Sequence, residues 1–487
     1  MTASGFGQTN EPFPSIVVRR NSLEPRGAYA ESLATHLTPN AEKVAELKGL
    51  LAQKNIGVVA HFYMDPELQA VIAACDWPHI YIADSLVMAG RAVEMVKAGV
   101  RAIVVLGVDF MSENARALID AAGFEEVPVY RVAHQRISCS LADAAASPDY
   151  HSYLEQAAET LNSLHVIYVN TGLDAKARAH CLLPTITCTS SNVVRLILQA
   201  AAQIPEVNIW FGPDTYMGEN LYRLFASLLK TSEHQIRELH RTHTHESIQR
   251  LLNHYHYYKK GACIVHELFG QEVVERIGRD YPDALVAAHL EVPGETFGLA
   301  LEAQRIGTGV VGSTSNILQF VSTVAKEAAL VKGTSRLQLV LGTETGMITS
   351  VVRRIQTILR ENAGRKSDVA IEIVFPVAPR AIAATSDSDL RTVPGVPGGE
   401  GCSLAGGCAV CPYMKMNSLD ALFGLLKLID RVDARELSRF EPRSYDQETN
   451  GSSVARIGGE TILYMQAFQQ TNSLPGELVR DVRSRNR

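Results

Sequence analysis

The sequence predicts an α/β protein made of three homologous αβα units, each with a short parallel sheet, arranged around a pseudo-threefold axis. Three observations predict this class. Short apolar runs rich in Val and Ile alternate with helical patterns, each run stops abruptly at polar residues, and the run endings recur three times in the same order. Continuous apolar runs of this length are typical of parallel strands that helices cover on both faces.

The composition excludes several classes of protein. The 487 residues include 46 Lys and Arg against 52 Asp and Glu, a net charge of −6, and 46% of them are hydrophobic. A mildly acidic chain without a long basic run is a poor candidate for binding nucleic acid or a membrane surface. The sequence lacks a secretory signal and the apolar stretch of about 18 to 20 residues that a membrane span needs. We therefore expect a soluble cytoplasmic protein. Its eight cysteines are too few for a disulfide scaffold and fit a reducing compartment, where cysteines tend to serve metal binding or catalysis.

The units follow one another along the chain after a lead-in without periodicity. The first clear helix begins at Asn40, with Val44, Leu47 and Leu51 on one face. The expected divisions are a flexible N-terminal segment (1–40), unit 1 (41–137), unit 2 with a His-rich insertion (138–262), unit 3 (263–410), and a cysteine-bearing loop with a closing helix and C-terminal tail (411–487).

Each unit has the same succession of strand endings. About 20 to 30 residues separate successive endings, the length of a strand–helix–strand unit with short loops. We interpret three matching triplets in one order as an internal repeat. The endings are His61-Phe62-Tyr63, Asp84-Ser85 and Gly107-Val108-Asp109 in unit 1, Tyr168-Val169-Asn170, Thr189-Ser190 and Gly212-Pro213-Asp214 in unit 2, and His289-Leu290-Glu291, Ser313-Thr314 and Gly342-Thr343-Glu344 in unit 3.

The first ending of each unit presents two polar side chains. Ligands of open parallel sheets sit beyond the carboxyl ends of the strands, and residues i and i+2 of a strand point to the same side. If the units face inward, all six side chains converge on one pocket. The pairs are His61 with Tyr63, Tyr168 with Asn170, and His289 with Glu291.

The second ending of each unit carries hydroxyl side chains before an apolar helical stretch. A helix start offers backbone N–H groups and a positive dipole end, which suit phosphate or carboxylate. Taken singly, such a residue is more often an ordinary helix cap. Together with the His, Tyr and Glu endings, the hydroxyls of Ser85, Ser190, Ser313 and Thr314 favour an anion pocket.

One cysteine follows each unit at an equivalent place, at Cys139, Cys263 and Cys411. Three thiolates that meet on the axis indicate a cubane [4Fe-4S] cluster with one iron that lacks a protein ligand. Such an open position allows Lewis-acid chemistry. Zinc is the competing metal, but the sequence has no paired CxxC knuckles and more than a hundred residues separate these cysteines, so iron–sulfur is favoured.

The remaining cysteines have plainer interpretations. Cys408 and Cys411 form a CxxC that is a minor candidate for a redox pair in the absence of the cluster, and the role of Cys402 stays open. Three others lie in or beside apolar runs and are expected to be buried core residues. These are Cys75, Cys181 and Cys188.

Two groups of histidines receive different interpretations. Six histidines lie within residues 234–256, in a stretch with helical spacing and abundant charge, which we interpret as a solvated inserted helix pair. His266 follows Cys263 by three residues, so it is expected to lie close to the cluster as a site residue.

The chain resembles the quinolinate synthase family, the iron–sulfur enzymes of NAD biosynthesis, in the motifs HFYMDPELQ, GVDFMSENA, CIVHELF, GTETGM and CPYMKMN. The resemblance runs from about residue 57 to 420 and points to the longer, plant-type form without its sulfur-transfer domain. It implies three αβα domains around a [4Fe-4S] cluster. It also implies condensation of iminoaspartate with dihydroxyacetone phosphate to quinolinate, phosphate and water, with iminoaspartate received from an aspartate-oxidising enzyme.

The resemblance also assigns roles to individual residues. It implies that Cys139, Cys263 and Cys411 are the cluster ligands, and Tyr63 matches a family tyrosine placed for proton transfer. The implied substrate contacts are His61, Ser85, Tyr168, Asn170, Ser190, His289, Glu291, Ser313 and Thr314.

Two positions depart from the family pattern. Leu290 stands between His289 and Glu291 where many relatives have proline, and strand alternation still projects the two polar side chains together. Ser138 replaces the usual glycine before Cys139, which puts the local turn in question and leaves the ligation unaffected.

The chemistry of the implied reaction suggests a role for each catalytic residue. We expect Glu291 and Tyr63 to transfer protons, and His61 and His289 to orient carboxylates and oxygens. The open iron is expected to serve as a Lewis acid without a change of oxidation state. Two other interpretations stay open: a cluster-bearing sensor or scaffold protein, and a zinc-stabilised protein that binds phosphorylated metabolites.

Overall fold

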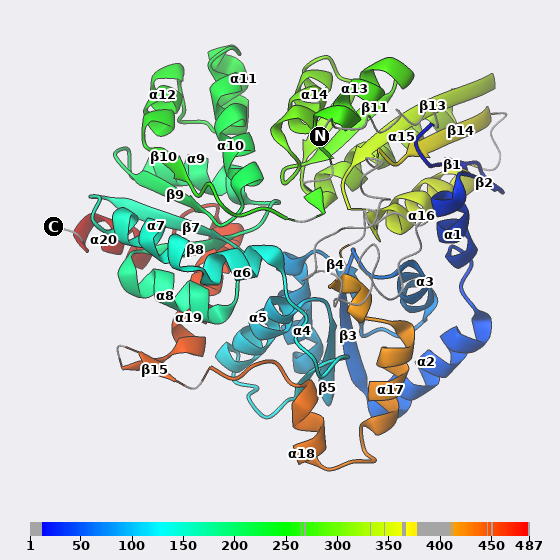
Figure 1. Cartoon of the computed structure of the whole chain (residues 1–487), viewed down its shortest axis with the longest axis horizontal. Coiled ribbons are helices and arrows are strands. Elements are labelled where there is room, and N and C mark those ends of the chain that lie inside the picture. Colours follow the sequence, from blue (N-terminus) through cyan, green and yellow to red (C-terminus); the bar gives the residue numbers. More distant parts are fainter. Residues whose placement is uncertain are drawn as a thin grey trace, which may run out of the picture. The chain divides into compact units, whose positions relative to one another are not determined.

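Figure 1 shows the protein as a computed structural model. By its contacts the chain divides into two compact units: the smaller comprises residues 1–38, 265–311 and 316–412, and the larger comprises residues 39–264, 312–315 and 413–487. The structure describes residues 12–263, 265–266, 269–331, 333–344, 346–362, 367–376, 411, 413–445, 447–449 and 451–485.

Three sheets repeat one order of strands (Figure 1). The first sheet has the order β4-β3-β5-β6, the second has the order β8-β7-β9-β10, and four of the six strands of the third sheet follow the same order, β12-β11-β13-β14. In each of these sets of four, the first strand along the chain lies between the second and the third, and the fourth flanks the third. The pairings among β3–β6, among β7–β10 and among β11, β13 and β14 are parallel. This order confirms the predicted α/β class. The strands are β3 (Ile56–His61), β4 (Ile80–Ala83), β5 (Ala102–Leu106), β6 (Val129–Arg131), β7 (Ser163–Tyr168), β8 (Thr185–Cys188), β9 (Asn208–Gly212), β10 (Tyr255–Tyr257), β11 (Leu285–His289), β12 (Gly309–Gly312), β13 (Gly333–Gly342) and β14 (Ser367–Val374).

Three of the inner strands are buried along their whole length. Every residue of β3, β5 and β7 is buried, and β-branched side chains are prominent among them. Helices α2 (Ala41–Lys54), α4 (Ser85–Lys97) and α5 (Asp109–Ala121) pack against the first sheet. Strands covered in this way lose the alternation of polar and apolar residues, which is why they stand out in the sequence as continuous apolar runs.

Short connections place helix starts close to strand ends. The residue Ser85 begins α4 two positions after β4, and Thr314 begins α15 (Thr314–Leu330) two positions after β12. Helix α10 (Thr215–Leu228) follows Asp214, whose Oδ1 accepts a hydrogen bond from the backbone N–H of Met217 at 3.0 Å. Polar residues at strand ends therefore lie beside exposed helix N–H groups, as an anion site requires.

The N-terminal segment was expected to be flexible, and this is wrong for the residues described there. Strand β1 (Ser15–Val18) is fully buried and pairs antiparallel with β14, and β2 (Leu23–Arg26) pairs antiparallel with β1. Helix α1 (Ala28–His36) follows. A four-residue apolar run is too short to show periodicity, and its hydrogen-bonding partner lies more than 300 residues away in the sequence.

One long helix from the C-terminal part of the chain packs on the second sheet. Helix α19 (Val454–Thr471) packs on α8 (Leu173–Leu182) and β8. The approach is close, because a Cβ at Gly458 would lie 2.4 Å from the carbonyl oxygen of Leu173. The hydroxyls of Thr187 and Thr461 hydrogen-bond at 2.8 Å. Two shorter helices, α17 (Leu419–Leu428) and α20 (Gly476–Ser484), lie on either side of α19 in the sequence. Among the described residues, no helix is both long and apolar enough to cross a membrane.

Candidate active site

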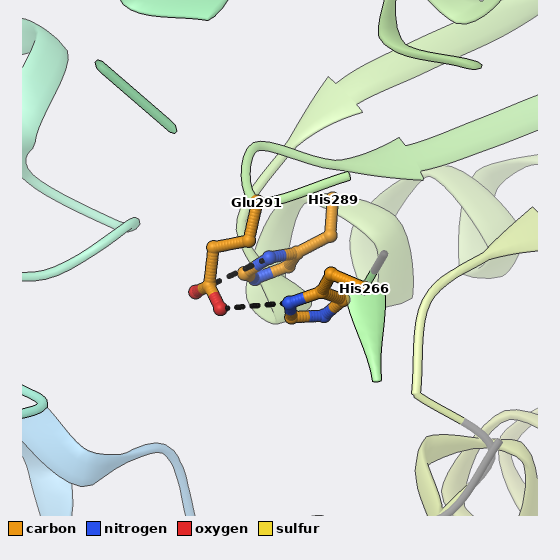
Figure 2. A group of neighbouring side chains, drawn as sticks. All are labelled: His266, His289 and Glu291. Carbon is orange, nitrogen blue, oxygen red and sulfur yellow. Dashed lines mark ion pairs between the residues drawn. The ribbon is translucent and has the colours of Figure 1, made fainter. Parts of the chain in front are cut away.

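A carboxylate lies between two buried imidazoles in the smaller unit (Figure 2). The Nδ1 atom of His266 lies 3.1 Å from Oε2 of Glu291, and the Nδ1 atom of His289 lies 3.4 Å from Oε1. The two rings stack with centroids 5.6 Å apart and planes 13° apart. The side chains are only 2% exposed for the histidines and 5% for the glutamate. We call these three residues the His–Glu triad.

The sequence positions the His–Glu triad from two segments. His289 is the last residue of β11, and Glu291 follows in a turn before α14 (Gly294–Arg305). His266 comes from the connection between β10 and α13 (Gln271–Asp280). Leu290, which stands in place of the family's proline, is buried at 2% exposure and leaves His289 and Glu291 in contact.

Burial governs the protonation of His289. Loss of solvation lowers the pKa of His289 to about 4, and the charge of Glu291 opposes this effect only in part. The imidazole is therefore neutral near pH 7, with one ring nitrogen as donor and the other as acceptor. A buried carboxylate beside a neutral imidazole is an arrangement that can take up and return a proton.

The His–Glu triad also has the composition of a divalent-cation site. One ligand atom from each residue lies within 4.8 Å of the others, and no other group of three such residues with this spacing occurs in the described part of the chain. Two imidazoles and a carboxylate are ligands that zinc and related cations accept.

The first ending of unit 1 lies next to the helix start of unit 3. His61 is the last residue of β3, and its ring contacts that of Tyr63 edge-on, with centroids 4.5 Å apart. The Tyr63 hydroxyl and Oγ1 of Thr314 are 3.4 Å apart, and both residues belong to the larger unit. The tertiary structure thus brings together two predicted site residues that are 251 positions apart in the sequence.

The helix starts of units 1 and 2 also meet. The Ser191 hydroxyl donates to Oδ2 of Asp84 at 3.4 Å, next to Ser190 and Ser85. Ser190 does not begin a helix, however. It lies in a turn closed by the side chain of Asn192, and α9 (Val193–Gln203) starts after that turn. The remaining hydroxyl, that of Ser313, is buried directly before α15.

A lysine that the sequence analysis did not single out supports the second pair of site residues. Tyr168 ends β7, and half-buried Asn170 follows in a bend. The Nζ atom of Lys176, on α8, donates to the carbonyl oxygens of Val169 at 3.2 Å and of Thr171. Full burial lowers the pKa of Lys176 to about 7, although nearby acidic groups oppose the shift. Its signal in the sequence is weak, because helical lysines are common.

The three predicted ligand cysteines lie on loops and share a similar exposure. Cys139 precedes α6 (Ser140–Ala146), and Cys263 and Cys411 have no regular secondary structure. All three are half-buried, and none of the cysteines in the described residues forms a disulfide. Their convergence on one cluster stays a prediction, and Cys402 and Cys408 lie outside the described residues.

The other cysteines divide by burial. Cys75 and Cys188 are buried, as expected for core residues, whereas Cys181 is half-buried. Burial raises the pKa of the Cys188 thiol well above its ordinary value, which keeps it protonated and unreactive.

The turn before Cys139 accommodates the serine that replaces the family's glycine. The Ser138 hydroxyl donates to both carboxylate oxygens of Asp143, at 2.9 and 2.8 Å. Ser138 is not among the residues with positive φ, so its backbone conformation does not require glycine.

The fold and the His–Glu triad define an α/β protein with a buried cluster of two imidazoles and one carboxylate beside the carboxyl end of β11. The family model of the quinolinate synthetase A protein matches residues 44–360. The chloroplastic quinolinate synthase of Nicotiana tabacum is 50% identical over 98% of this chain and 68% of its own length. The chloroplastic quinolinate synthase of Arabidopsis thaliana is 50% identical over 97% of this chain and 67% of its own length. The chain therefore belongs to the quinolinate synthase family and is an enzyme of this kind.

More distant relatives match a shorter part of the chain. The quinolinate synthase of Prochlorococcus marinus (strain MIT 9303) is 25% identical over 81% of this chain and 86% of its own length. The chain spans about two thirds of the length of its plant relatives.

The expectation of a cytoplasmic location is wrong. Plant relatives from tobacco, Arabidopsis and rice, which match nearly the whole chain, are each named chloroplastic. The expectation rested on the lack of a secretory signal and of a membrane-spanning stretch, and neither feature separates cytoplasm from plastid.

Proposed function

We propose that this protein condenses iminoaspartate with dihydroxyacetone phosphate to quinolinate, phosphate and water, in the de novo biosynthesis of NAD. The supporting observation is the His–Glu triad: a buried carboxylate held at 3.1 and 3.4 Å by two imidazoles, in a chain that belongs to the quinolinate synthase family. Ring formation from these substrates needs several proton transfers, and the triad is equipped for them.

The strand endings that carry hydroxyl side chains bind the anionic groups of the substrates. One substrate carries two carboxylates and the other a phosphate. Ser85 and Thr314 begin helices, where hydroxyl and backbone N–H donors coincide. Ser190 and Ser313 add hydroxyls from a turn and from the residue before α15. Tyr168 and Asn170 supply further hydrogen-bonding groups at the end of β7, where Lys176 holds the backbone.

Proton transfer falls to Glu291 and Tyr63. Glu291 accepts a proton from a substrate carbon or nitrogen and returns it to a leaving oxygen, while the neutral ring of His289 orients the substrate. Tyr63 donates and recovers a proton through its hydroxyl, which is 3.4 Å from that of Thr314. His61 contacts the ring of Tyr63 and orients a substrate carboxylate.

The donor set of the three loop cysteines fits an iron–sulfur cluster. Three half-buried thiols outside any disulfide suit a [4Fe-4S] cluster that keeps one iron open, and Cys139, Cys263 and Cys411 would hold it. When bound, such a cluster supplies Lewis-acid chemistry to a substrate oxygen.

A Glu291→Gln variant tests the proposed role of the carboxylate. The variant removes the proton acceptor and keeps the shape, so we expect quinolinate formation to fall at least about 100-fold. The brown colour of the anaerobically purified protein should not change. Glu302→Gln, at an exposed ion pair with Arg305, is the matched control and should keep full activity. Normal activity of Glu291→Gln contradicts the role.

Metal analysis tests the alternative use of the His–Glu triad. Its ligand atoms lie within 4.8 Å of one another, so a tightly bound divalent cation is the competing interpretation. We expect iron and sulfide in a ratio of about one to one and no stoichiometric zinc. If the protein instead binds one zinc per chain and His266→Ala loses it, the triad is a cation site and its proposed acid–base role is wrong.

We also propose a plastid location and supply of iminoaspartate by an aspartate-oxidising enzyme. The location follows from the relationship to plant proteins named chloroplastic. The supply follows from the chemistry of the proposed substrate, since iminoaspartate is the two-electron oxidation product of aspartate. A fluorescent fusion of the full-length protein should accumulate in plastids. Coupled turnover of aspartate should require an aspartate oxidase, and quinolinate formed from aspartate alone would contradict the proposed supply.

A further inference from the structure

The third strand ending of each unit has no part in the proposed substrate site. These endings are Asp109, Asp214 with the adjoining Thr215, and Glu344. Each lies where a helix begins: α5, α10 and α16 (Gly346–Glu361). In every case a side chain at this place hydrogen-bonds the main chain close to the cysteine that follows the unit.

Asp109 holds the segment before Cys139 with two hydrogen bonds. Its backbone N–H donates to the Ile137 carbonyl at 2.9 Å, and its Oδ1 accepts from the Ile137 N–H at 3.2 Å. Arg131 donates to the same Oδ1 at 2.7 Å and to the carbonyl of Gln135 at 3.1 Å. The main chain two residues before the cysteine is therefore tied to the start of α5.

Thr215 makes the corresponding contact before Cys263. Its backbone N–H donates to the Gly261 carbonyl at 2.8 Å, and its hydroxyl accepts from the Gly261 N–H at 3.0 Å. The approach requires glycine, since a Cβ at position 261 would lie 2.1 Å from the carbonyl oxygen of Pro213. The contact again lies two residues before the cysteine, at the start of α10.

Glu344 makes the third contact with the cysteine itself. Its Oε1 accepts from the backbone N–H of Cys411 at 3.0 Å, and its Oε2 accepts from the N–H of Gly346 at 3.1 Å. The side chain is almost fully buried, at 1% exposure for the residue. One carboxylate therefore joins the first turn of α16 to a cysteine 67 positions further along the chain.

We propose that Asp109, Thr215 and Glu344 are positioning residues that hold the three cysteine segments ready for cluster binding. The inference rests on the proposed role of Cys139, Cys263 and Cys411 as ligands. Ordinary loop hydrogen bonds have no reason to recur at the same ending of three sheets and within two residues of each cysteine. A segment that is already ordered loses less conformational entropy when its thiolate binds metal, and such supporting contacts commonly tune ligand sites.

Thiol reactivity of the full-length protein without cluster tests the inference at Thr215. Thr215→Val keeps the shape but leaves the Gly261 N–H without its acceptor. We expect alkylation of Cys263 to rise roughly threefold to tenfold relative to Cys139 in the same chain, as expected for the loss of one hydrogen bond. The matched control is Thr244→Val, which removes a hydroxyl that accepts from the Ser247 N–H at the start of α12 (His245–Asn253). This control should leave the alkylation of Cys263 relative to Cys139 unchanged.

A second variant tests the positioning role independently at Glu344. Glu344→Gln keeps one acceptor and loses the other, so alkylation of Cys411 should rise relative to Cys263 by a similar factor. After anaerobic reconstitution, both Thr215→Val and Glu344→Gln should release iron to a chelator faster than the wild type, with melting temperatures close to that of Thr244→Val.

The possible outcomes separate the two proposals. The positioning role is overturned if the relative alkylation rates of the cysteines are unchanged in both variants. It is also overturned if alkylation rises equally at all three cysteines, because an equal rise reports a general loss of structure. A wild-type protein that binds no iron on reconstitution overturns the cluster assignment. In that case the alkylation ratios still decide whether these side chains hold the cysteine segments.

Discussion

Two regions of the molecule are rich in histidine, and they use it in opposite ways. Residues 234–256 contain six histidines in and around helices α11 (Glu233–Leu239) and α12, whereas the His–Glu triad contains two. In the first region the rings serve the fold: His243 bonds the Ser247 hydroxyl at 2.9 Å and the Leu198 carbonyl at 2.8 Å, and His240 bonds Gln199 at 2.8 Å. In the second region the imidazoles face a carboxylate (Figure 2).

The comparison teaches that the density of histidine in a sequence is a poor guide to chemistry. Whether a histidine serves the fold or a reaction depends on the partners of its ring nitrogens and on the burial of the neighbouring charge. Both ring nitrogens of His243 bond neutral groups of the scaffold. His289 and His266 instead share a buried carboxylate, at 3.4 and 3.1 Å. The expected helix pair is present in α11 and α12, although His243 itself is buried.

The largest effect is expected on turnover. His266→Gln removes one imidazole from Glu291, and we expect kcat to fall at least about 100-fold. His245→Gln is the matched control from the other region. Its ring bonds the carbonyl of Thr231 at 2.8 Å and is not part of the triad, so activity should stay within about twofold of the wild type. If kcat fell equally in the two variants, the proposed difference between the two regions would be wrong.

The next effect concerns the pH dependence of stability. Burial lowers the pKa of His289 to about 4 from an unfolded value of 6.5, so the unfolded chain binds the proton first as pH falls. This contribution is full above pH 6.5, is lost as pH falls from 6.5 to about 4, and changes no further below that. The shift corresponds to about 3 kcal/mol.

Urea unfolding between pH 4 and 7.5 measures this dependence. His289→Gln should show a flatter pH profile than the wild type, since the variant has no imidazole to titrate at this position. An unchanged slope would show that folding does not shift the pKa of this imidazole. His243, whose pKa burial also lowers, serves as a comparison in which the carbonyl of Leu198 opposes the shift.

A smaller effect is expected at the structural histidine. His243→Leu keeps the bulk of the ring but leaves the Leu198 carbonyl without its donor, so we expect a loss of about 2 kcal/mol in the free energy of unfolding. Activity per folded molecule should not change. Urea denaturation followed by an activity assay at low denaturant separates the two quantities, and a drop in kcat would place this region in the reaction.

The smallest effect is expected at the surface. His234 pairs with Glu238 one helical turn away at 3.5 Å, and its side chain is 82% exposed. Such pairs contribute about 0.5 kcal/mol or less. His234→Gln should therefore leave the free energy of unfolding nearly unchanged, and a loss comparable to that of His243→Leu would contradict the distinction between solvated and structural rings.

Much of the fold could be predicted because its signals are local. The apolar runs of β3, β5 and β7 occur where the sequence predicts strands, since a strand buried on both faces has no polar positions. Strand β1 was missed because its four residues obtain their hydrogen bonds from β14. Helix α9 begins later than predicted because Asn192 closes a turn first, which depends on one side-chain hydrogen bond.

The candidate site was predictable in part for the same reason. His289 and Glu291 are two positions apart, and spacing alone made them a pair. Contacts between distant residues were not predictable, such as Tyr63 with Thr314 and Ser191 with Asp84. The support of Asn170 by Lys176 was also missed, because a buried lysine on a helix has the same sequence pattern as an exposed one.

The amino-acid sequence by itself determined the α/β class, the threefold repetition, and which residue types stand at the strand ends, because apolar periodicity and short spacing act within a few turns of chain. Only the tertiary structure decided which imidazoles share a carboxylate, how far burial moves the pKa of His289, and which side chains hold the cysteine segments. Those properties depend on desolvation and on hydrogen bonds between residues far apart in the sequence, such as Glu344 and Cys411, which are 67 positions apart. No local sequence pattern encodes them.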